Sequence, residues 1–151
     1  MEGITAVPQP DFALAPWGRA CLRLLMAGSI VSPTAVVRAF WAAYRSGDVQ
    51  GAFGFWSADA VWRLTGRHAR AGDYTPGDYA EMLAAFSAEY PDYSGEFLNA
   101  RTLGELALFD VRSRNGPGPG ESQGIIIYRV RNGLIVEGWA IPANHGGRYP
   151  F

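Results

Sequence analysis

The chain has 151 residues, 48% hydrophobic and 13% aromatic, with a formal net charge of −1, which indicates one folded domain and excludes a mostly disordered chain. The single cysteine excludes a disulfide scaffold and a multi-cysteine metal site, and the near-neutral charge excludes a basic nucleic-acid footprint. All 13 basic residues are arginine, which excludes Schiff-base chemistry on lysine and a P-loop lysine.

The first segment in chain order carries no clear targeting signal. No apolar run reaches the length needed to span a bilayer. The best candidate for a signal peptide, Trp17–Val31, has a short, interrupted apolar core and no A-x-A cleavage site. We expect a cytoplasmic protein with a partly ordered arm at residues 1–31, Met26 being an alternative start, and a single domain at residues 32–151.

Three helices are predicted next. Ser32 followed by Pro33 is typical of a helix start, and Gly47 ends that helix. Asp48 caps a short second helix, and a third begins at Thr75 and ends before Pro91. The apolar residues on their inward faces are Val36, Val37, Phe40, Trp41 and Tyr44 in the first helix, Ala52, Phe53 and Trp56 in the second, and Tyr79, Met82, Leu83 and Phe86 in the third.

The remaining segments read as strands. Residues 60–65 form a strand, residues 66–74 a polar loop, and four further strands follow at residues 94–103, 105–114, 122–131 and 134–142. Asn132-Gly133 is the pair that most readily takes a type I′ hairpin turn. Helices followed by an antiparallel meander predict an α+β domain. A strongly curled sheet with helices across one face would make a cone with a pocket inside.

Four segments in this order, VVRAFWAAYRSGD, WSADAVWRL, GRHARAGDYTPGD and YRVRNGLIVEGW, resemble the SnoaL-like branch of the nuclear transport factor 2-like (NTF2-like) superfamily. That branch includes polyketide cyclases, ketosteroid isomerases and epoxide hydrolases. The resemblance covers about residues 32–142. It implies a cone-shaped α+β barrel, usually a homodimer through the outer face of its sheet. The fold hosts many chemistries, so the resemblance alone does not fix the function.

The family's acid–base positions are apolar here. Where ketosteroid isomerases place a tyrosine and two aspartates, this chain has Phe40, Leu64 and Ile127, so steroid-type enolisation is disfavoured and an apolar pocket wall is implied. Where epoxide hydrolases place an aspartate after the last strand, it has Asn144, which can orient a water but cannot take its proton.

Asp110 and Arg112 remain as a possible catalytic pair. They alternate on one strand and therefore share a face, which the resemblance makes the concave one. The alternative is a solvated pair at a strand end.

Two histidines are candidate proton carriers. His68 lies in the predicted loop with Asp73 and Tyr74, which in this superfamily borders the pocket mouth, and it could act as a general base or be an exposed loop residue. His145 follows Asn144 and could replace the missing aspartate or belong to a frayed tail.

The other candidate substrate contacts are aromatic or small. The Tyr44 hydroxyl could donate to a substrate oxygen, whereas Trp41 and Trp62 could form either a substrate platform or core. Glu137 and Trp139 are expected to point outward, which leaves Gly138 and Ala140 on the pocket face, where small residues would enlarge the cavity. Three further expected lining residues are Met82, Phe86 and Leu108.

Three functions stay open. The first is a cofactor-independent cyclase or isomerase that positions a bulky apolar, polyketide-like molecule in an apolar pocket, including cycloaddition-type ring closure. The second is a hydrolase or dehydratase that activates water with Asp110 or His145. The third is a non-catalytic dimer that binds a small molecule. We expect no metal, cofactor, nucleic acid or membrane partner.

Overall fold

The computed structural model describes residues 31–118 and 120–142. Its elements in chain order are α2 (Pro33–Arg45), α3 (Val49–Phe53), β1 (Trp56–Leu64), β2 (Gly72–Tyr74), α4 (Pro76–Glu89), β3 (Ser94–Leu103), β4 (Leu106–Arg114), β5 (Glu121–Arg131) and β6 (Leu134–Pro142). The α+β prediction is therefore confirmed. Almost all of the expected arm lies outside the described residues.

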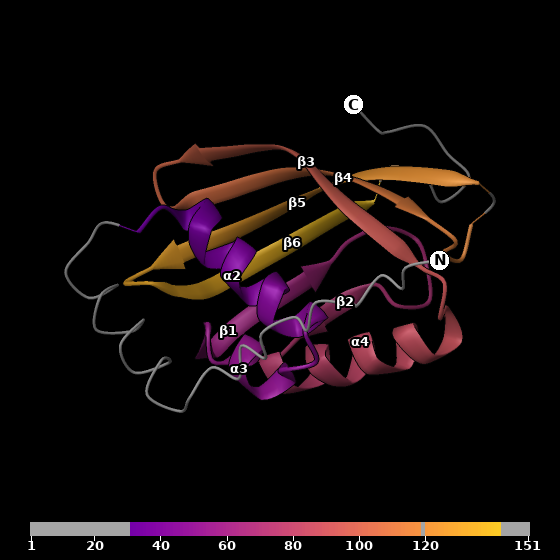
Figure 1. Ribbon diagram of the computed structural model, residues 1–151, viewed down its shortest axis with the longest axis horizontal. Helices are drawn as coiled ribbons and strands as arrows, with labels where there is room; N and C mark the ends of the chain where they lie inside the picture. Colours follow the sequence, from indigo (N-terminus) through magenta and orange to yellow (C-terminus); the bar gives the residue numbers. More distant parts are fainter. Residues whose placement is uncertain (1–30, 119, 143–151) are drawn as a thin grey trace, which may run out of the picture. The chain divides into compact units, whose positions relative to one another are not determined.

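The six strands form one mixed sheet in the order β2-β1-β6-β5-β4-β3 (Figure 1). Strands β3 to β6 make the predicted antiparallel meander, but β1 runs parallel to β6. The sheet is therefore mixed, and the predicted meander accounts for its four last strands. Two expectations need correction: the loop expected at residues 66–74 ends in the short strand β2, and Trp56 opens β1 rather than belonging to a helix.

The predicted helix caps are confirmed. The Ser32 hydroxyl accepts from the backbone N–H of Ala35, and an Asp48 carboxylate oxygen accepts from that of Gly51. Thr75 forms a capping box with Asp78, in which each side chain accepts from the other residue's backbone N–H. These contacts satisfy backbone donors that the first turn of a helix leaves unpaired.

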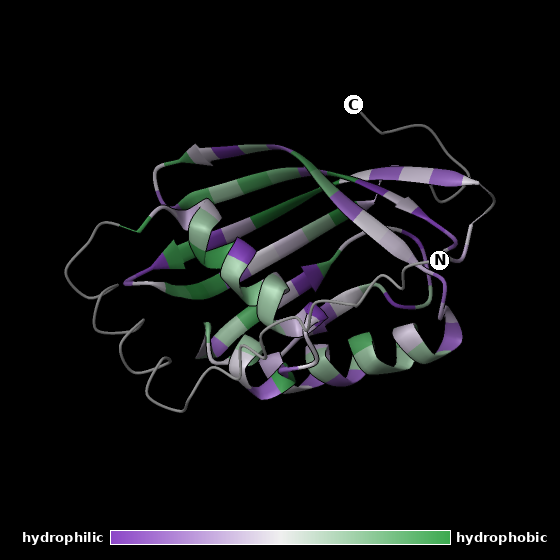
Figure 2. Ribbon diagram, in the orientation of Figure 1, coloured by the Kyte–Doolittle hydropathy of each residue, from purple (hydrophilic) through white to green (hydrophobic). Residues whose placement is uncertain are grey.

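The helices lie against one face of the sheet, called here the inner face. α2 crosses strands β3 to β6, and α4 packs on β1 and β2 (Figure 1). Apolar residues follow the central strands and α2, whereas the hydrophilic residues of β4 and β5 gather near their connecting hairpin (Figure 2). The buried core consists of Val36, Val37, Phe40, Ala52, Trp56, Ala60, Trp62, Tyr79, Ala107, Phe109, Tyr128, Val130 and Ile135.

No helix within the described ranges is long and apolar enough to cross a membrane.

Candidate functional site

The register of the sheet decides which side chains reach the inner face. Phe109 and Tyr128 are completely buried there. Their neighbours Leu108 and Ile127 are paired with each other, and Ile127 is paired with Trp139. Successive side chains of a strand point to opposite faces, so these three lie on the outer face. The expectation that Leu108 and Ile127 line the pocket is therefore wrong.

A β-bulge in β6 changes which residue of β5 lies opposite Gly138. A tight turn at Asn132-Gly133 with regular pairing would set Ile127 opposite Gly138, on the expected pocket face. The register instead shifts between the pairs Val130–Ile135 and Arg129–Glu137. The extra residue in β6 moves every later pairing by one position, and Tyr128 becomes the residue opposite Gly138.

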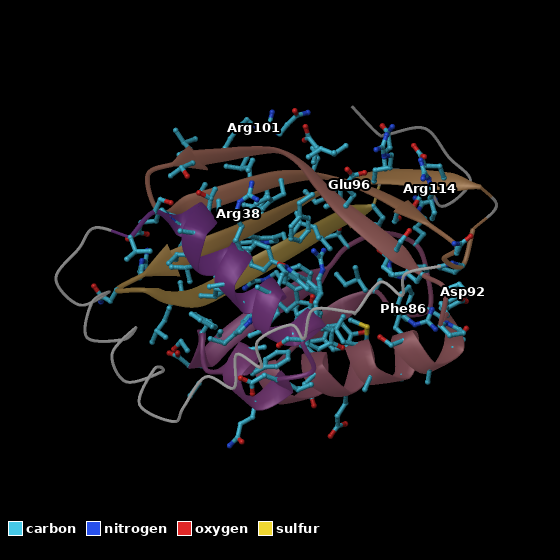
Figure 3. The ribbon with its side chains drawn as sticks, viewed as in Figure 1. Arg38, Phe86, Asp92, Glu96, Arg101 and Arg114 are labelled. Carbon is cyan, nitrogen blue, oxygen red and sulfur yellow. The ribbon has the colours of Figure 1, made fainter. Side chains whose placement is uncertain are left out.

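Asp110 and Arg112 also lie on the outer face, because they flank Phe109 and Val111 of the inner face. Asp110 accepts a hydrogen bond from the Asn99 amide at 3.0 Å and ion-pairs with Arg101 at 2.7 Å. Arg112 ion-pairs with Glu96 at 2.6 Å instead of with Asp110. The expectation that the two line the concave side as a catalytic pair is thus contradicted, and each belongs to a separate surface ion pair. Figure 3 labels Glu96 and Arg101, their partners, on β3.

His68 is held by its own loop. Its Nδ1 accepts from the backbone N–H of Arg70 at 3.2 Å, and its Nε2 lies 3.0 Å from the Thr65 carbonyl oxygen. This pattern corresponds to a neutral imidazole protonated on Nε2, with the basic nitrogen already occupied. Both contacts fix the loop, so the geometry favours a structural histidine over a general base.

Asp73 and Tyr74 lie on different faces of the sheet. Asp73 is paired with Arg63 on the outer face, with its side chain 68% exposed and 3.8 Å from the guanidinium. The expectation that Asp73 borders the pocket is therefore wrong. Tyr74 is half-buried against the core, and its hydroxyl donates to the Arg70 carbonyl oxygen at 2.6 Å. The structure does not bring His68, Asp73 and Tyr74 together as one polar group.

The closed part of the inner face is an aromatic layer, called here the floor, which consists of Phe40, Trp62, Tyr79, Phe109 and Tyr128. The Trp62 ring stacks on Tyr79 at 4.7 Å and on Tyr128 at 5.3 Å between centroids. Phe40 and Trp62 are at most 2% exposed, so these expected substrate contacts are core. Trp41 is half-buried beside them.

The space left by the missing side chain of Gly138 is filled by the floor and does not form a cavity. A Cβ at Gly138 would lie 2.4 Å from the Trp62 ring. Real Cβ contacts are never this short, so the indole occupies the room that the missing side chain leaves. The expectation that Gly138 enlarges a pocket is therefore wrong.

The inner face opens in one direction. Along β4, Ala107 and Phe109 are buried and Val111 is half-buried; along β5, Tyr128 is buried and Ile126 is half-buried. Along β1 and β6, the inner-face residues also change from buried to half-buried. The half-buried residues that border the floor form what we call the open end: Tyr44, Leu64, Met82, Phe97, Val111, Ile126 and Ala140.

The rim beyond the open end is built by α4 and the β4–β5 hairpin. Phe86 and Asp92 lie at the end of α4 and just after it, and Arg114 lies at the hairpin (Figure 3). The Asn115 amide donates to the Asp92 carbonyl oxygen, which joins the two segments. A shallow hollow of about 610 Å³ is lined here by Glu89, Tyr90, Pro91, Asp92 and Asn115.

Arg70 closes one side of this rim. Its guanidinium lies 5.4 Å from the centroid of the Phe86 ring and 5.6 Å from that of Tyr90, and it ion-pairs with Glu89. The expected substrate contact Phe86 therefore packs against Arg70, Tyr90 and Tyr93 at the rim.

Two buried tyrosines were missed as candidate site residues. Trp41 Nε1 donates to the Tyr128 hydroxyl at 2.9 Å, and the rings of Tyr79 and Tyr128 both stack on Trp62. Burial raises the pKa of both phenols, so both stay protonated. The helical spacing had placed Tyr79 on the inward face of α4, but nothing in the sequence showed that it packs against Trp62.

Asn144 and His145 lie outside the described residues. Within residues 31–118 and 120–142, no group of three or more histidine, cysteine or carboxylate side chains could hold a metal ion.

Comparisons with known proteins agree with this architecture. The SnoaL-like domain family matches residues 37–138, so the chain belongs to that family. This confirms the resemblance found in the sequence. No curated protein sequence matches the chain.

Three solved structures illustrate the fold. IdmH from Streptomyces antibioticus, provisionally assigned as a polyketide cyclase, is 21% identical, with a TM-score of 0.59, over 73% of this chain and 91% of its own. A protein of unknown function with a cystatin-like fold from Xanthomonas campestris is 17% identical, with a TM-score of 0.65, over 76% and 92%. A provisionally assigned ketosteroid isomerase from Kribbella flavida is 17% identical, with a TM-score of 0.59, over 79% and 83%. At these identities the likeness shows the NTF2-like fold alone.

Proposed function

We propose that the protein is a cofactor-independent cyclase or isomerase. It holds a bulky, apolar, oxygenated molecule of polyketide type against the open end and promotes ring closure or rearrangement mainly by positioning it. The observation that carries the proposal is the gradient on the inner face, where a buried aromatic floor gives way to half-buried apolar side chains. Such a surface can fold a flexible chain into a reactive conformation, and orientation alone can supply several kcal/mol of the barrier.

The placement of the acidic and basic groups supports positioning over strong acid–base catalysis. Asp110 lies on the face opposite the open end, and both nitrogens of His68 contact backbone atoms of their own loop. The alternative function, a hydrolase that activates water, can no longer use Asp110 as its base. The other alternative, a protein that binds a small molecule without converting it, would use the same apolar surface. A turnover assay distinguishes this binding protein from an enzyme.

A pair of adjacent isoleucines tests where the ligand binds. The probe is 2-isopropenylnaphthalene, an apolar bicyclic molecule, and binding is followed by NMR titration. Ile126→Trp adds bulk at the open end and should abolish binding. Ile125→Trp adds the same bulk on the outer face and should leave binding unchanged. Equal effects of the two substitutions, or no binding to the wild type, would refute a ligand site at the open end.

We also propose a homodimer through the outer face of the sheet. This face carries six half-buried apolar side chains, Leu98, Leu108, Ile125, Ile127, Trp139 and Ile141. The Trp139 ring lies near the guanidinium groups of Arg63 and Arg129, and both arginines ion-pair with Glu137. A large apolar patch rimmed by paired charges is typical of a protein interface.

Sedimentation tests the dimer. Ile127→Glu places a charge in the middle of the patch and should convert the dimer to a monomer. Val49→Glu makes the same change at an exposed apolar residue of α3 and should leave the dimer intact. A wild-type monomer at micromolar concentration would overturn the proposal.

A further inference from the structure

An arginine borders the open end where α2 meets β3. Arg45, the last residue of α2, donates from Nη2 to the Gly95 carbonyl oxygen at 3.2 Å. Its guanidinium carbon lies 5.7 Å from the centroid of the Phe97 ring. Because Phe97 is an open-end residue, the guanidinium lies at the border of the proposed ligand site. A guanidinium has five N–H donors, and the bond to Gly95 uses one of them.

No carboxylate among the described residues forms an ion pair with Arg45. The sequence of α2 contains no acidic residue. On the neighbouring strands, Glu96 pairs with Arg112 and Glu121 pairs with Arg114. A cation in the last turn also stabilises a helix, but that effect leaves its N–H groups free to bind other acceptors. The charge of Arg45 is therefore available to a ligand.

Hydroxyl groups lie on the same face beside Gly95. A Cβ at Gly95 would lie 3.3 Å from the Tyr93 hydroxyl oxygen, so this hydroxyl lies close above the glycine. Gly95 is paired with Ser113, and Ser113 is paired with Ser122, which puts both serines in the same row of the inner face. The two serine oxygens are 2.6 Å apart. One hydrogen bond joins them, so one of their two protons is left for another acceptor.

These side chains, called here the donor group, suit an anion. The donor group consists of Arg45, Tyr93, Ser113 and Ser122, and it combines one positive charge with hydroxyl protons and no carboxylate. A cationic ligand would be repelled by Arg45. A carboxylate only accepts hydrogen bonds, can accept several at once, and forms strong ones with arginine.

We propose that the donor group binds a carboxylate of the substrate, which makes the substrate a bulky apolar acid. This inference rests on the proposed function and deepens it. Phe97 and Val111 of the open end are each two residues from Gly95 and Ser113 on the same face of their strands. A single ligand can therefore place its apolar body on the open end and its carboxylate at the donor group, and the anchored carboxylate fixes the orientation of the body.

Two probes of the same shape test the charge of the ligand. 2-Naphthoate carries a carboxylate where 2-naphthamide carries a neutral amide, whose NH₂ group would face further donors. The wild type should bind 2-naphthoate about tenfold more tightly at neutral pH, as expected for a hydrogen bond to a charged group at an exposed position. Binding is followed by NMR titration, and 2-isopropenylnaphthalene reports on the apolar site alone.

Substitutions of two arginines on one helix locate the donor. Arg45→Gln removes the charge and should abolish most of the preference for 2-naphthoate, whereas Arg45→Lys should keep part of it. Arg38→Gln makes the same change seven residues earlier on α2 (Figure 3) and should keep the preference. The separation is about 10 Å along the helix, beyond the screening length of about 8 Å at physiological ionic strength.

Two further measurements separate direct contact from a structural effect. The Nε–Hε signal of Arg45 should shift on addition of 2-naphthoate and change little on addition of 2-naphthamide. The double variant Ser113→Ala/Ser122→Ala should weaken the preference, whereas Ser94→Ala, at an exposed outer-face position of β3, should not. Thermal denaturation checks that each variant folds; if the double serine variant does not, Arg45→Gln carries the test.

The possible results are distinguishable. Equal affinity of the wild type for 2-naphthoate and 2-naphthamide, with 2-isopropenylnaphthalene bound, would overturn the carboxylate site and leave the apolar site intact. A preference that survives Arg45→Gln, or that Arg38→Gln reduces equally, would also overturn it. Binding of none of the three probes would remove the open-end site, and with it both proposals.

Discussion

The substitution Gly138→Ala tests how tightly the aromatic floor is packed. The added Cβ would lie 2.4 Å and 2.6 Å from two ring carbons of Trp62 and 3.3 Å from a ring carbon of Tyr128. Trp62 is 2% exposed and stacked between two other rings, so it cannot move away freely. Inserting one methyl group into a core of this kind costs about 1–3 kcal/mol. For a domain of this size, that lowers Tm by about 3–12 °C.

The matched control is Gly77→Ala. A Cβ at Gly77 would meet only the Thr75 hydroxyl, at 3.9 Å, and Gly77 lies in the first turn of α4. Alanine is favoured over glycine in helices, so this variant should be up to about 1 kcal/mol more stable than the wild type. The stability of both variants is measured by thermal denaturation.

Combining Gly138→Ala with Trp62→Phe, which has a smaller ring, should recover part of the stability that Gly138→Ala loses. A Gly138→Ala variant as stable as the wild type would show that the Trp62 ring does not fill this space, and the description of a closed floor would fail.

Two further predictions follow from the caps and the outer face. Thr75→Ala removes the capping box of α4 and should lower the free energy of unfolding by about 1 kcal/mol, measured by urea denaturation; no change would show that the cap contributes nothing. Asp110→Asn weakens one partly exposed ion pair, so it should cost at most about 1 kcal/mol of stability and leave the affinity for 2-isopropenylnaphthalene unchanged. A large loss of probe affinity in Asp110→Asn would return this residue to the ligand site.

Local signals in the sequence were sufficient to predict most of the elements. Ser32 and Thr75 cap the helices they were expected to cap, because a capping side chain bonds to a backbone group only three residues away. The hairpin at Asn132-Gly133 forms as expected, with both residues at positive φ. These features depend on neighbours in the chain, and the sequence contains those neighbours.

The site depends on contacts that no local pattern encodes. The parallel pairing of β1 with β6 joins residues more than 70 positions apart, and it places Trp62 opposite Gly138. One bulged residue in β6 places Tyr128, instead of Ile127, opposite Gly138. The alternation of Ile126, Tyr128 and Val130 was visible in the sequence, but it fixes only that these residues share a face and not which face it is.

The pH dependence of stability tests whether Tyr79 and Tyr128 are buried as described. Burial raises the pKa of both phenols in the folded state, whereas an unfolded tyrosine titrates near 10. Below pH 10 both states hold the proton and these groups cause no pH dependence. Above pH 10 the unfolded state loses protons that the folded state keeps, so stability falls as pH rises. Well above pH 10, each phenol contributes at most about 1.4 kcal/mol per pH unit, and at pH 10 it contributes about half of that. Urea denaturation between pH 8 and pH 11 should show this fall, and Tyr79→Phe should make it shallower. A slope that is the same in the variant would mean that the Tyr79 hydroxyl is open to solvent, and the description of Tyr79 as part of the buried floor would then fail.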